Sequence, residues 1–173
     1  DIVRNSLSGT IEQGGEVMEA PSGVFENAFE IDEAMEYPSV VIMGNLSPET
    51  LVNPDDYPNG FPFKISKTPA GRIYRLDKEG IMPSVLRNLA VSRKETQHKM
   101  REAYENGNSI LGDILNRKQT VMKQNMNSWY GVLGSGATEK TKRRPFRLAN
   151  PLIGSDITEV ARLHNRWNKE RVY

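Results

Sequence analysis

Apolar positions recur at helical spacing along two stretches in the middle of the chain. The first predicts a helix over residues 82–104, with Pro83 in its first turn, which is a favourable place for proline. The second predicts a helix over residues 109–129. Since residues 105–108 (ENGN) read as a tight turn between them, we expect the two helices to form an antiparallel hairpin.

The second helix carries the longer apolar stripe, and we interpret this stripe as core. Its members lie on one helical face: Leu111, Leu115, Met122, Met126, Trp129 and Leu133. The remaining predictions are a strand over 24–31, a buried strand or buried helix over 37–43, a loop over 50–60, a β-hairpin of 61–66 with 72–76, and a helix over 157–171.

Charge is distributed unevenly, although the net charge is only +1. Residues 1–60 hold twelve acidic residues and one basic residue, a net charge of −11, whereas residues 61–173 hold 22 basic and ten acidic residues, a net charge of +12. Regions with this much positive charge commonly bind polyanions such as phosphates. The alternative is that the basic face pairs with the acidic third, and charge alone leaves both open.

Several classes of protein are excluded by composition. No apolar run is long enough to span a membrane, and no basic-then-apolar leader is visible. The absence of cysteine excludes disulfides and thiolate metal sites, and two histidines, His98 and His164, are too few for a histidine-built zinc site. We expect a soluble, intracellular protein without a membrane partner. Because the chain begins with Asp1, we also expect a trimmed or processed piece of something longer.

One polar face of the second helix is a candidate for phosphate binding. Lys123, Asn127 and Tyr130 are spaced i, i+4, i+7 and share that face. Arg93 and Lys123 each lie about 20 Å from the turn at 1.5 Å per residue, so the hairpin would place them level, near its base. Two converging cations suit a triphosphate. The alternative is two exposed cations on unrelated sides.

Asp32 is the candidate for a metal ligand. It follows the predicted strand, with Glu30, Glu33 and Glu36 nearby. A carboxylate at a strand end is a suitable place for a Mg²⁺ ligand, because Mg²⁺ prefers carboxylates together with substrate phosphates. A solvated acidic cluster is the alternative.

Two longer motifs carry a resemblance to a known family. Residues 32–41 (DEAMEYPSVV) and 45–50 (NLSPET) resemble the first palm motif of family B DNA polymerases, D-x-x-S-L-Y-P-S-I-I, and its continuation N-x-S-P-E-T in T-even-phage members. Residues 123–131 (KQNMNSWYG) resemble the second motif, K-x-x-x-N-S-x-Y-G. Weaker likenesses, to the linker glycines, the first fingers helix and a later palm segment, lie in residues 13–15, 93–102 and 147–158.

The resemblance implies an α+β fold: part of a polymerase palm with an inserted antiparallel two-helix fingers hairpin. Residues 1–81 would be an N-terminal palm segment with the first motif, residues 82–126 the fingers, and residues 127–173 a palm return segment. The implied activity is DNA-directed DNA synthesis, in which a primer 3′-OH attacks the α-phosphate of a dNTP at a two-metal Mg²⁺ site.

The first motif implies roles for five residues. Asp32 is similar to the catalytic aspartate that binds metal, and Glu33 to the residue whose backbone carbonyl helps to hold a metal ion. Met35 and Glu36 occupy the stretch whose backbone receives the triphosphate. Tyr37 is similar to the ring beneath the incoming sugar, which excludes a ribose 2′-OH.

The fingers and the second motif imply further contacts to nucleotide and DNA. Arg93 and Lys123 resemble the cations that grip the triphosphate, and Asn127 lies near the nascent base pair. DNA contacts are implied for Gly14, Gly15, Ser128, Tyr130 and Gly131.

Three departures from the family pattern bear on activity. Met35-Glu36 replaces Ser-Leu and puts a carboxylate beside the expected triphosphate. The second fingers lysine is Gln97 here, and Lys94 or Lys99 is the nearest substitute. The third motif, Y-x-D-T-D-S, is not present in this sequence, and neither are the exonuclease and thumb domains.

Two hypotheses follow from these departures. The first is a fragment or subunit of a viral, split DNA polymerase in the host cytoplasm, inactive alone. A second polypeptide would supply the D-T-D motif and thumb, and another the exonuclease. The second is a degenerate, non-catalytic module that binds DNA or a replication partner.

Overall fold

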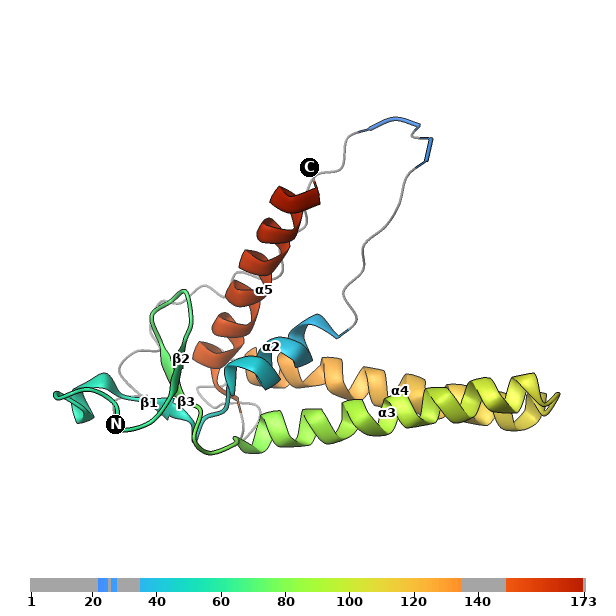
Figure 1. Ribbon diagram of the computed structural model, residues 1–173, viewed down its shortest axis with the longest axis horizontal. Coiled ribbons are helices and arrows are strands. Elements are labelled where there is room, and N and C mark those ends of the chain that lie inside the picture. The colour runs from blue at the N-terminus through green and yellow to red at the C-terminus, as the bar shows by residue number, and fades with distance from the viewer. Residues whose placement is uncertain (1–21, 25, 28–34, 135–148, 173) are drawn as a thin grey trace, which may run out of the picture.

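The structure, a computed structural model, describes residues 22–24, 26–27, 35–134 and 149–172. Helices and one small antiparallel sheet make up these residues (Figure 1). In chain order the elements are α2 (Glu36–Gly44), β1 (Leu51–Val52), the 3-10 helix η1 (Pro54–Asp56), β2 (Ile65–Lys67), β3 (Ile73–Arg75), α3 (Ile81–Glu105), α4 (Ser109–Gly134) and α5 (Pro151–Val172).

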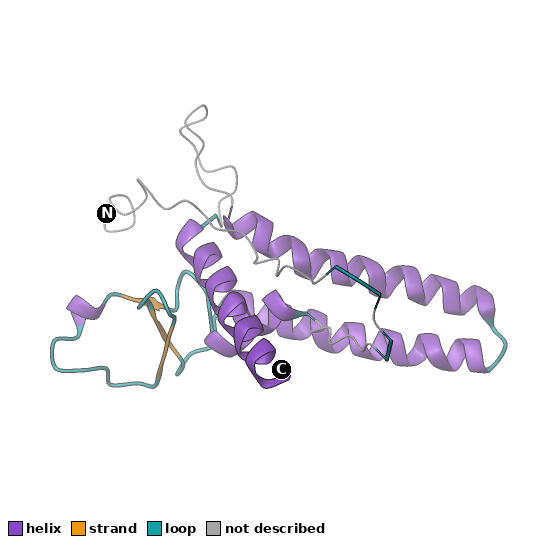
Figure 2. Cartoon of the chain, turned by 90° about the horizontal axis from the view of Figure 1, so that it is seen from above, coloured by secondary structure: helices purple, strands orange, loops and turns teal. Residues whose placement is uncertain are grey.

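The two long helices predicted from the sequence are present as α3 and α4, which run side by side in opposite directions (Figures 1 and 2). At the turn, the Asn108 amide donates to the Ala103 carbonyl at 2.9 Å, and Gly107 takes a left-handed φ of 73°. The Tyr104 hydroxyl then bonds the Asp113 carboxylate at 2.8 Å. Helix α4 continues five residues beyond its expected end at 129.

The interpretation of the α4 stripe as core is correct for only part of its length. Met126 and Leu133 are 1% and 0% exposed, whereas Leu111 is 43% exposed. Near the turn, α3 is the only described element beside α4, because the helix pair extends away from the other described elements (Figure 1). Burial is therefore confined to the end of α4 that meets α2 and α5.

The apolar run at 37–43, which the sequence allows as a strand or a helix, forms helix α2. The helix is capped at its C-terminal end by Asn45, which is left-handed with φ 53°. The Asn45 side chain donates to the Arg75 and Lys78 carbonyls at 2.6 and 2.8 Å and accepts from the Gly80 amide at 2.8 Å. These bonds fix the end of α2 against the residues that lead into α3.

The sheet has the order β1-β3-β2, with both pairings antiparallel. The predicted hairpin is present as β2 and β3, but its strands are shorter than expected. The expected loop over 50–60 is wrong in part, because Leu51–Val52 forms β1 and pairs with β3. The strand expected over 24–31 lies mostly outside the described residues, and residues 22–24 and 26–27 are not in a strand.

Helix α5 begins at Pro151, six residues before the start predicted from the sequence. Its buried Asp156 accepts hydrogen bonds from Thr68 Oγ1 at 2.7 Å, Arg72 Nε at 2.7 Å and Tyr74 Oη at 2.5 Å. These three donors lie on or beside the β2–β3 hairpin, so one carboxylate ties α5 to the sheet. The main core lies where the helices and β3 meet: Val41, Leu46, Tyr74, Met82, Leu86, Met126, Leu133, Ile153 and Ile157.

Candidate functional site

The first turn of α2 forms one wall of the candidate site. Met35 is its N-cap, with a left-handed φ of 64° and no side-chain cap hydrogen bond. The first amides of a helix lack intrahelical acceptors, and the helix dipole makes this end attractive to anions. Glu36 is acidic in the same turn, and its Oε1 is buried without a hydrogen-bond partner. Because Pro38 has no amide N–H, the turn combines two amides without intrahelical acceptors, those of Glu36 and Tyr37, with a buried carboxylate oxygen that has no hydrogen-bond partner.

Tyr37 joins this turn to α4. Its ring lies against the ring of Tyr130, with centroids 4.8 Å apart and planes tilted by 32°. Burial raises the pKa of the Tyr37 phenol, the Glu36 carboxylate raises it further, and Arg162 of α5 acts in the opposite direction. Sequence reasoning did not single out Arg162, because nothing local connects residues 125 positions apart.

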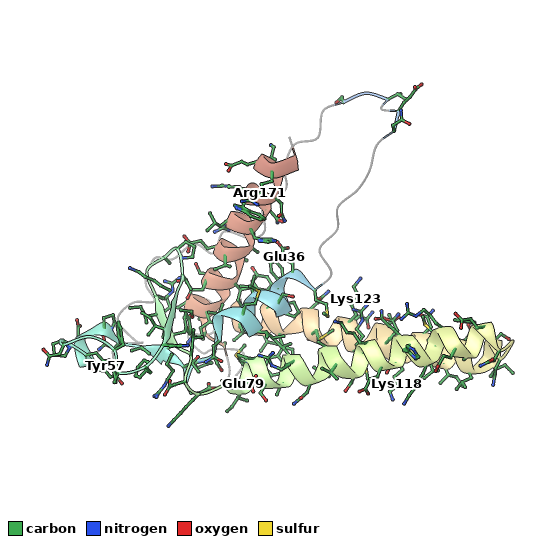
Figure 3. All side chains as sticks on the ribbon, in the orientation of Figure 1. Glu36, Tyr57, Glu79, Lys118, Lys123 and Arg171 are labelled. Carbon is green, nitrogen blue, oxygen red and sulfur yellow. The ribbon has the colours of Figure 1, made fainter. Side chains whose placement is uncertain are left out.

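The α4 face predicted from spacing is present. Lys123 and Asn127 are exposed, and Tyr130 is half-buried against Tyr37. Figure 3 shows Lys123 and Glu36 above the helix pair in that view. The structure therefore brings the start of α2 to the Tyr130 end of the face that carries Lys123.

Arg93 is held by the neighbouring helix. Its Nε donates to Gln119 Oε1 at 3.2 Å, and Gln97 Nε2 bonds the same oxygen at 3.4 Å. Arg93 is thus level with Gln119, about 6 Å along the axis from Lys123. The expectation that both cations lie near the base of the helix pair is wrong. Each lies near the middle of its helix: Arg93 is 12 residues from either end of α3, and Lys123 is 11 residues before the end of α4.

The other predicted contacts fall into three groups. Lys99 is exposed, about 9 Å along α3 from Arg93 toward the turn. Ser128 Oγ bonds the Asn125 carbonyl of its own helix at 2.8 Å, and a Cβ on Gly131 would meet no heavy atom within 4 Å. The four residues Asp32, Glu33, Gly14 and Gly15 lie outside the described residues.

Within the described ranges, no group of three or more His, Cys, Asp or Glu side chains is arranged to hold a metal ion. None of the helices in that part of the chain combines the length and apolar character that a membrane crossing requires.

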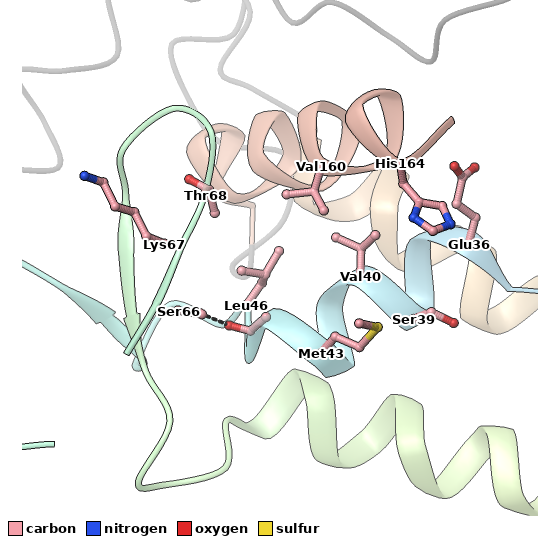
Figure 4. A pocket seen from close by; sticks show the side chains of 11 residues that line it. Glu36, Ser39, Val40, Met43, Leu46, Ser66, Lys67, Thr68, Val160 and His164 are labelled. Atoms are coloured by element: carbon pink, nitrogen blue, oxygen red, sulfur yellow. Dashed lines mark hydrogen bonds between the residues drawn. The ribbon is translucent and has the colours of Figure 1, made fainter. Parts of the chain in front are cut away.

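A cavity of about 300 Å³ lies between α2, α5 and β2 (Figure 4). Val40, Leu46 and Val160 supply apolar lining, with Glu36 and His164 at one end and Lys67 at the other. Of the site residues predicted from the sequence, only Glu36 lines it. The cavity is therefore separate from the α4 face.

Comparison with known proteins identifies the family. The sequence profile described as DNA polymerase family B matches residues 2–139. The chain belongs to this family, as its motifs predicted. It is 33% identical over 135 residues to a DNA polymerase delta catalytic subunit of Arabidopsis thaliana, covering 75% of this chain and 12% of the relative.

A viral relative and a solved structure agree with this assignment. The chain is 32% identical over 133 residues to a DNA polymerase of Paramecium bursaria Chlorella virus NY2A, covering 71% of this chain and 15% of the relative. The fold is similar to the family B DNA polymerase from Pyrobaculum calidifontis, with a TM-score of 0.59 and 24% identity over 79% of this chain and 16% of that chain. The chain thus spans less than one-sixth of each.

Proposed function

We propose that this chain is one part of a DNA-directed DNA polymerase, carrying the first metal aspartate and the dNTP-binding fingers. The observation that carries the proposal is the contact between Tyr37 and Tyr130, at 4.8 Å between ring centroids. Tyr37 belongs to the first motif and Tyr130 to the second, so the two motifs meet in space as a shared nucleotide site requires. Residues 82–126 would be the fingers, inserted between palm segments 1–81 and 127–173.

Each side chain has a distinct role in this proposal. The first-turn amides of α2 and the Lys123 ammonium bind the triphosphate, and Arg93 adds charge after exchanging its Gln119 contact for phosphate. Tyr37 and Tyr130 form a platform under the incoming sugar and base. Glu36 weakens phosphate binding, because like charges repel.

The metal role rests on residues that the structure does not describe. Asp32 and the Glu33 carbonyl would hold Mg²⁺, and a carboxylate with a carbonyl suits a hard cation. When bound, Mg²⁺ would stabilise charge on the attacking and leaving oxygens. Because this sequence has one identified metal carboxylate, the remaining ligands must come from elsewhere.

The proposed partners are primer-template DNA, dNTP and a second polypeptide that carries the D-T-D motif and the thumb. A further polypeptide with an exonuclease would complete the enzyme. The chlorella virus relative supports a viral origin, and the assembly would work in the host cytoplasm.

A non-catalytic binding module is the second candidate, and two observations favour it. A buried, unpartnered oxygen of Glu36 lies in the turn that should receive phosphate. Gln97 stands at the family's second lysine position and shares Gln119 with Arg93. Both features reduce the positive charge offered to a triphosphate.

Primer extension distinguishes the two candidates. The chain alone should not extend a primer, and mixing it with a polypeptide that carries the D-T-D motif and thumb should restore synthesis. Asp32→Ala should abolish turnover in the mixture while DNA binding persists. If the mixture binds primer-template DNA but the wild-type chain supports no synthesis, the non-catalytic module is the better description.

A further inference from the structure

The two halves of α5 differ in what covers them. Every buried residue of α5 lies in its first half, ending at Ala161. Residues 162–171, here called the outer half, include no buried residue. In Figure 1 this end of α5 extends away from the other described elements. His164 lines the cavity between α2, α5 and β2, but the more distant Trp167 and Arg171 are exposed and are not part of the core.

Three planar side chains of the outer half stack on one another. The His164 and Trp167 rings are 6.0 Å apart at an angle of 21°, and the Arg171 guanidinium lies 4.1 Å from the centre of the Trp167 ring. The residues are spaced i, i+3, i+7, so they share one helical face. We call this set the planar ladder. Trp167 remains 47% exposed within it.

The outer half is also strongly basic. It contains Arg162, Arg166, Lys169 and Arg171 against the single acid Glu170, a net charge of +3. Basic residues in a last turn stabilise a helix through its dipole, which accounts for Lys169 and Arg171. The dipole does not account for a half-exposed indole between two other planar groups. A ligand with both negative charge and flat apolar faces would use both features.

We propose that the outer half of α5 binds single-stranded DNA, with bases continuing the stack from its Arg171 end and phosphates paired with Lys169 and Arg171. Base–aromatic stacking beside a basic surface is how proteins hold single strands without sequence preference. Paired bases do not offer their faces, so the ladder favours a single strand over a duplex. The stack is preorganised, which lowers the entropic cost of binding.

This inference rests on the proposed polymerase function, since such an enzyme handles an unpaired template strand. Arg162 begins the outer half and acts electrostatically on Tyr37, so the outer half starts beside the candidate nucleotide site. From Arg162 to Arg171 the helix extends about 14 Å further. A strand leaving the site along α5 would therefore pass the ladder.

Tryptophan fluorescence tests this placement directly, because the chain has only two tryptophans. In the Trp129→Phe variant of the full chain, Trp167 is the only indole. Titration with a thymidine oligonucleotide should quench its emission, and the affinity should fall as salt rises. In the Trp167→Phe variant, Trp129 should report little change, because it is half-buried in α4.

Variants then measure the contributions of stacking and charge. Trp167→Ala should weaken oligonucleotide binding about 5- to 150-fold by anisotropy of a labelled oligonucleotide, whereas Trp167→Phe should retain most of it. Arg171→Gln should reduce the log–log salt slope by about 0.7. Lys118→Gln, at an exposed lysine of α4 far from α5 (Figure 3), is the matched control and should leave the slope unchanged. Circular dichroism confirms that each variant keeps its helices.

Three results would overturn the inference. These are unquenched Trp167 emission at saturating oligonucleotide, wild-type affinity in Trp167→Ala, and stronger quenching of Trp167 by duplex DNA than by the single strand. Any of them would leave the outer half as a protein-facing or duplex-facing surface. Primer extension by the assembled mixture is scored separately. If the mixture extends a primer but the oligonucleotide does not bind at Trp167, only the ladder proposal is refuted. If the oligonucleotide binds there but the mixture does not extend a primer, only the catalytic proposal is refuted.

Discussion

The Tyr37 ring of α2 rests against the Tyr130 ring of α4, with centroids 4.8 Å apart. The two residues are 93 positions apart, and each belongs to a different polymerase-like motif. Their contact places the α2 first turn beside the helix face that carries Lys123 and Asn127. The predictions about nucleotide binding depend on this convergence.

Tyr37→Ala should change which sugar the assembled enzyme accepts. Removing the ring opens the space that a ribose 2′-OH would need, so ribonucleotide incorporation should rise while dNTP incorporation changes little. Tyr37→Phe keeps the ring and should retain discrimination. Single-nucleotide incorporation assays with one dNTP and its ribonucleotide counterpart measure this discrimination in both variants. Unchanged discrimination in Tyr37→Ala would place the sugar elsewhere.

Lys123→Ala should lower the kcat/KM of the assembled enzyme for dNTP. Loss of a charge-assisted contact costs about 1.5–3 kcal/mol, or roughly 10- to 150-fold in kcat/KM. Because the contact is present in both ground and transition states, part of the loss should be a raised KM for dNTP. Lys118→Ala, also on α4 but outside the candidate face, should behave as wild type. Equal losses in both variants would mean that only general charge matters.

Asp156→Ala should destabilise the fold strongly. The carboxylate is 0% exposed and accepts bonds from three side chains, and removing it takes their shared acceptor from the buried Tyr74 and Thr68 hydroxyls and the half-buried Arg72 guanidinium. Removing one partner of a buried pair costs about 3–5 kcal/mol. Burial first, and then the Asp156 charge, raises the pKa of the Tyr74 phenol, consistent with a tightly enclosed pair. Urea unfolding of the variant measures the loss.

The matched control for Asp156→Ala is Asp77→Asn. Asp77 pairs with Arg75 at 2.7 Å on the surface, where solvent screens the interaction. The urea unfolding midpoint of the Asp77→Asn variant should stay close to that of the wild-type chain. Similar midpoints in both variants would mean that Asp156 does not tie α5 to the sheet.

Glu49 should make stability depend on pH in the acid range. Burial raises the pKa of its carboxyl, but hydrogen bonds from the Ile81 amide, its own amide and the Ser47 hydroxyl lower it more, to below its ordinary 4.5. Because the folded pKa is the lower one, this stabilisation is complete above about pH 4.5 and is lost as pH falls through the folded value. Glu49→Gln should flatten this part of the profile in unfolding experiments from pH 7 to 3. An unchanged profile would assign the acid sensitivity to other groups.

Local pattern predicted the elements that are long and regular. Helices α3 and α4 follow from 3.6-residue periodicity bounded by Pro83 and the turn at Gly107. Strand β1 has only two residues, so it offers no alternation to detect, and it forms because β3 provides a pairing edge. The apolar run in α2 fits strand or helix equally, and its burial against α3, α4 and α5 decides the outcome.

The candidate site was predictable only where helical spacing or a motif marked its residues. Lys123, Asn127 and Tyr130 share a face because helical spacing requires it. Arg162 and Asp156 act on residues more than 80 positions away, so no local pattern marks them. Leu111 was wrongly assigned to the core, since periodicity shows that a face is apolar but not whether another element covers it.

Gly131→Ala should raise stability and lower DNA binding together. Gly131 is exposed within α4, and a Cβ there would meet no heavy atom of the protein within 4 Å. Alanine favours a helix over glycine by about 1 kcal/mol, so the folded chain offers no reason for glycine at this position. If the position faces DNA, as we propose, the added methyl should weaken primer-template binding measured by anisotropy. Gly112→Ala is the control: its Cβ would lie against the Tyr104 ring, so it should lower the melting temperature instead. Wild-type DNA affinity in a stabilised Gly131→Ala chain would remove this face of α4 from the DNA contact.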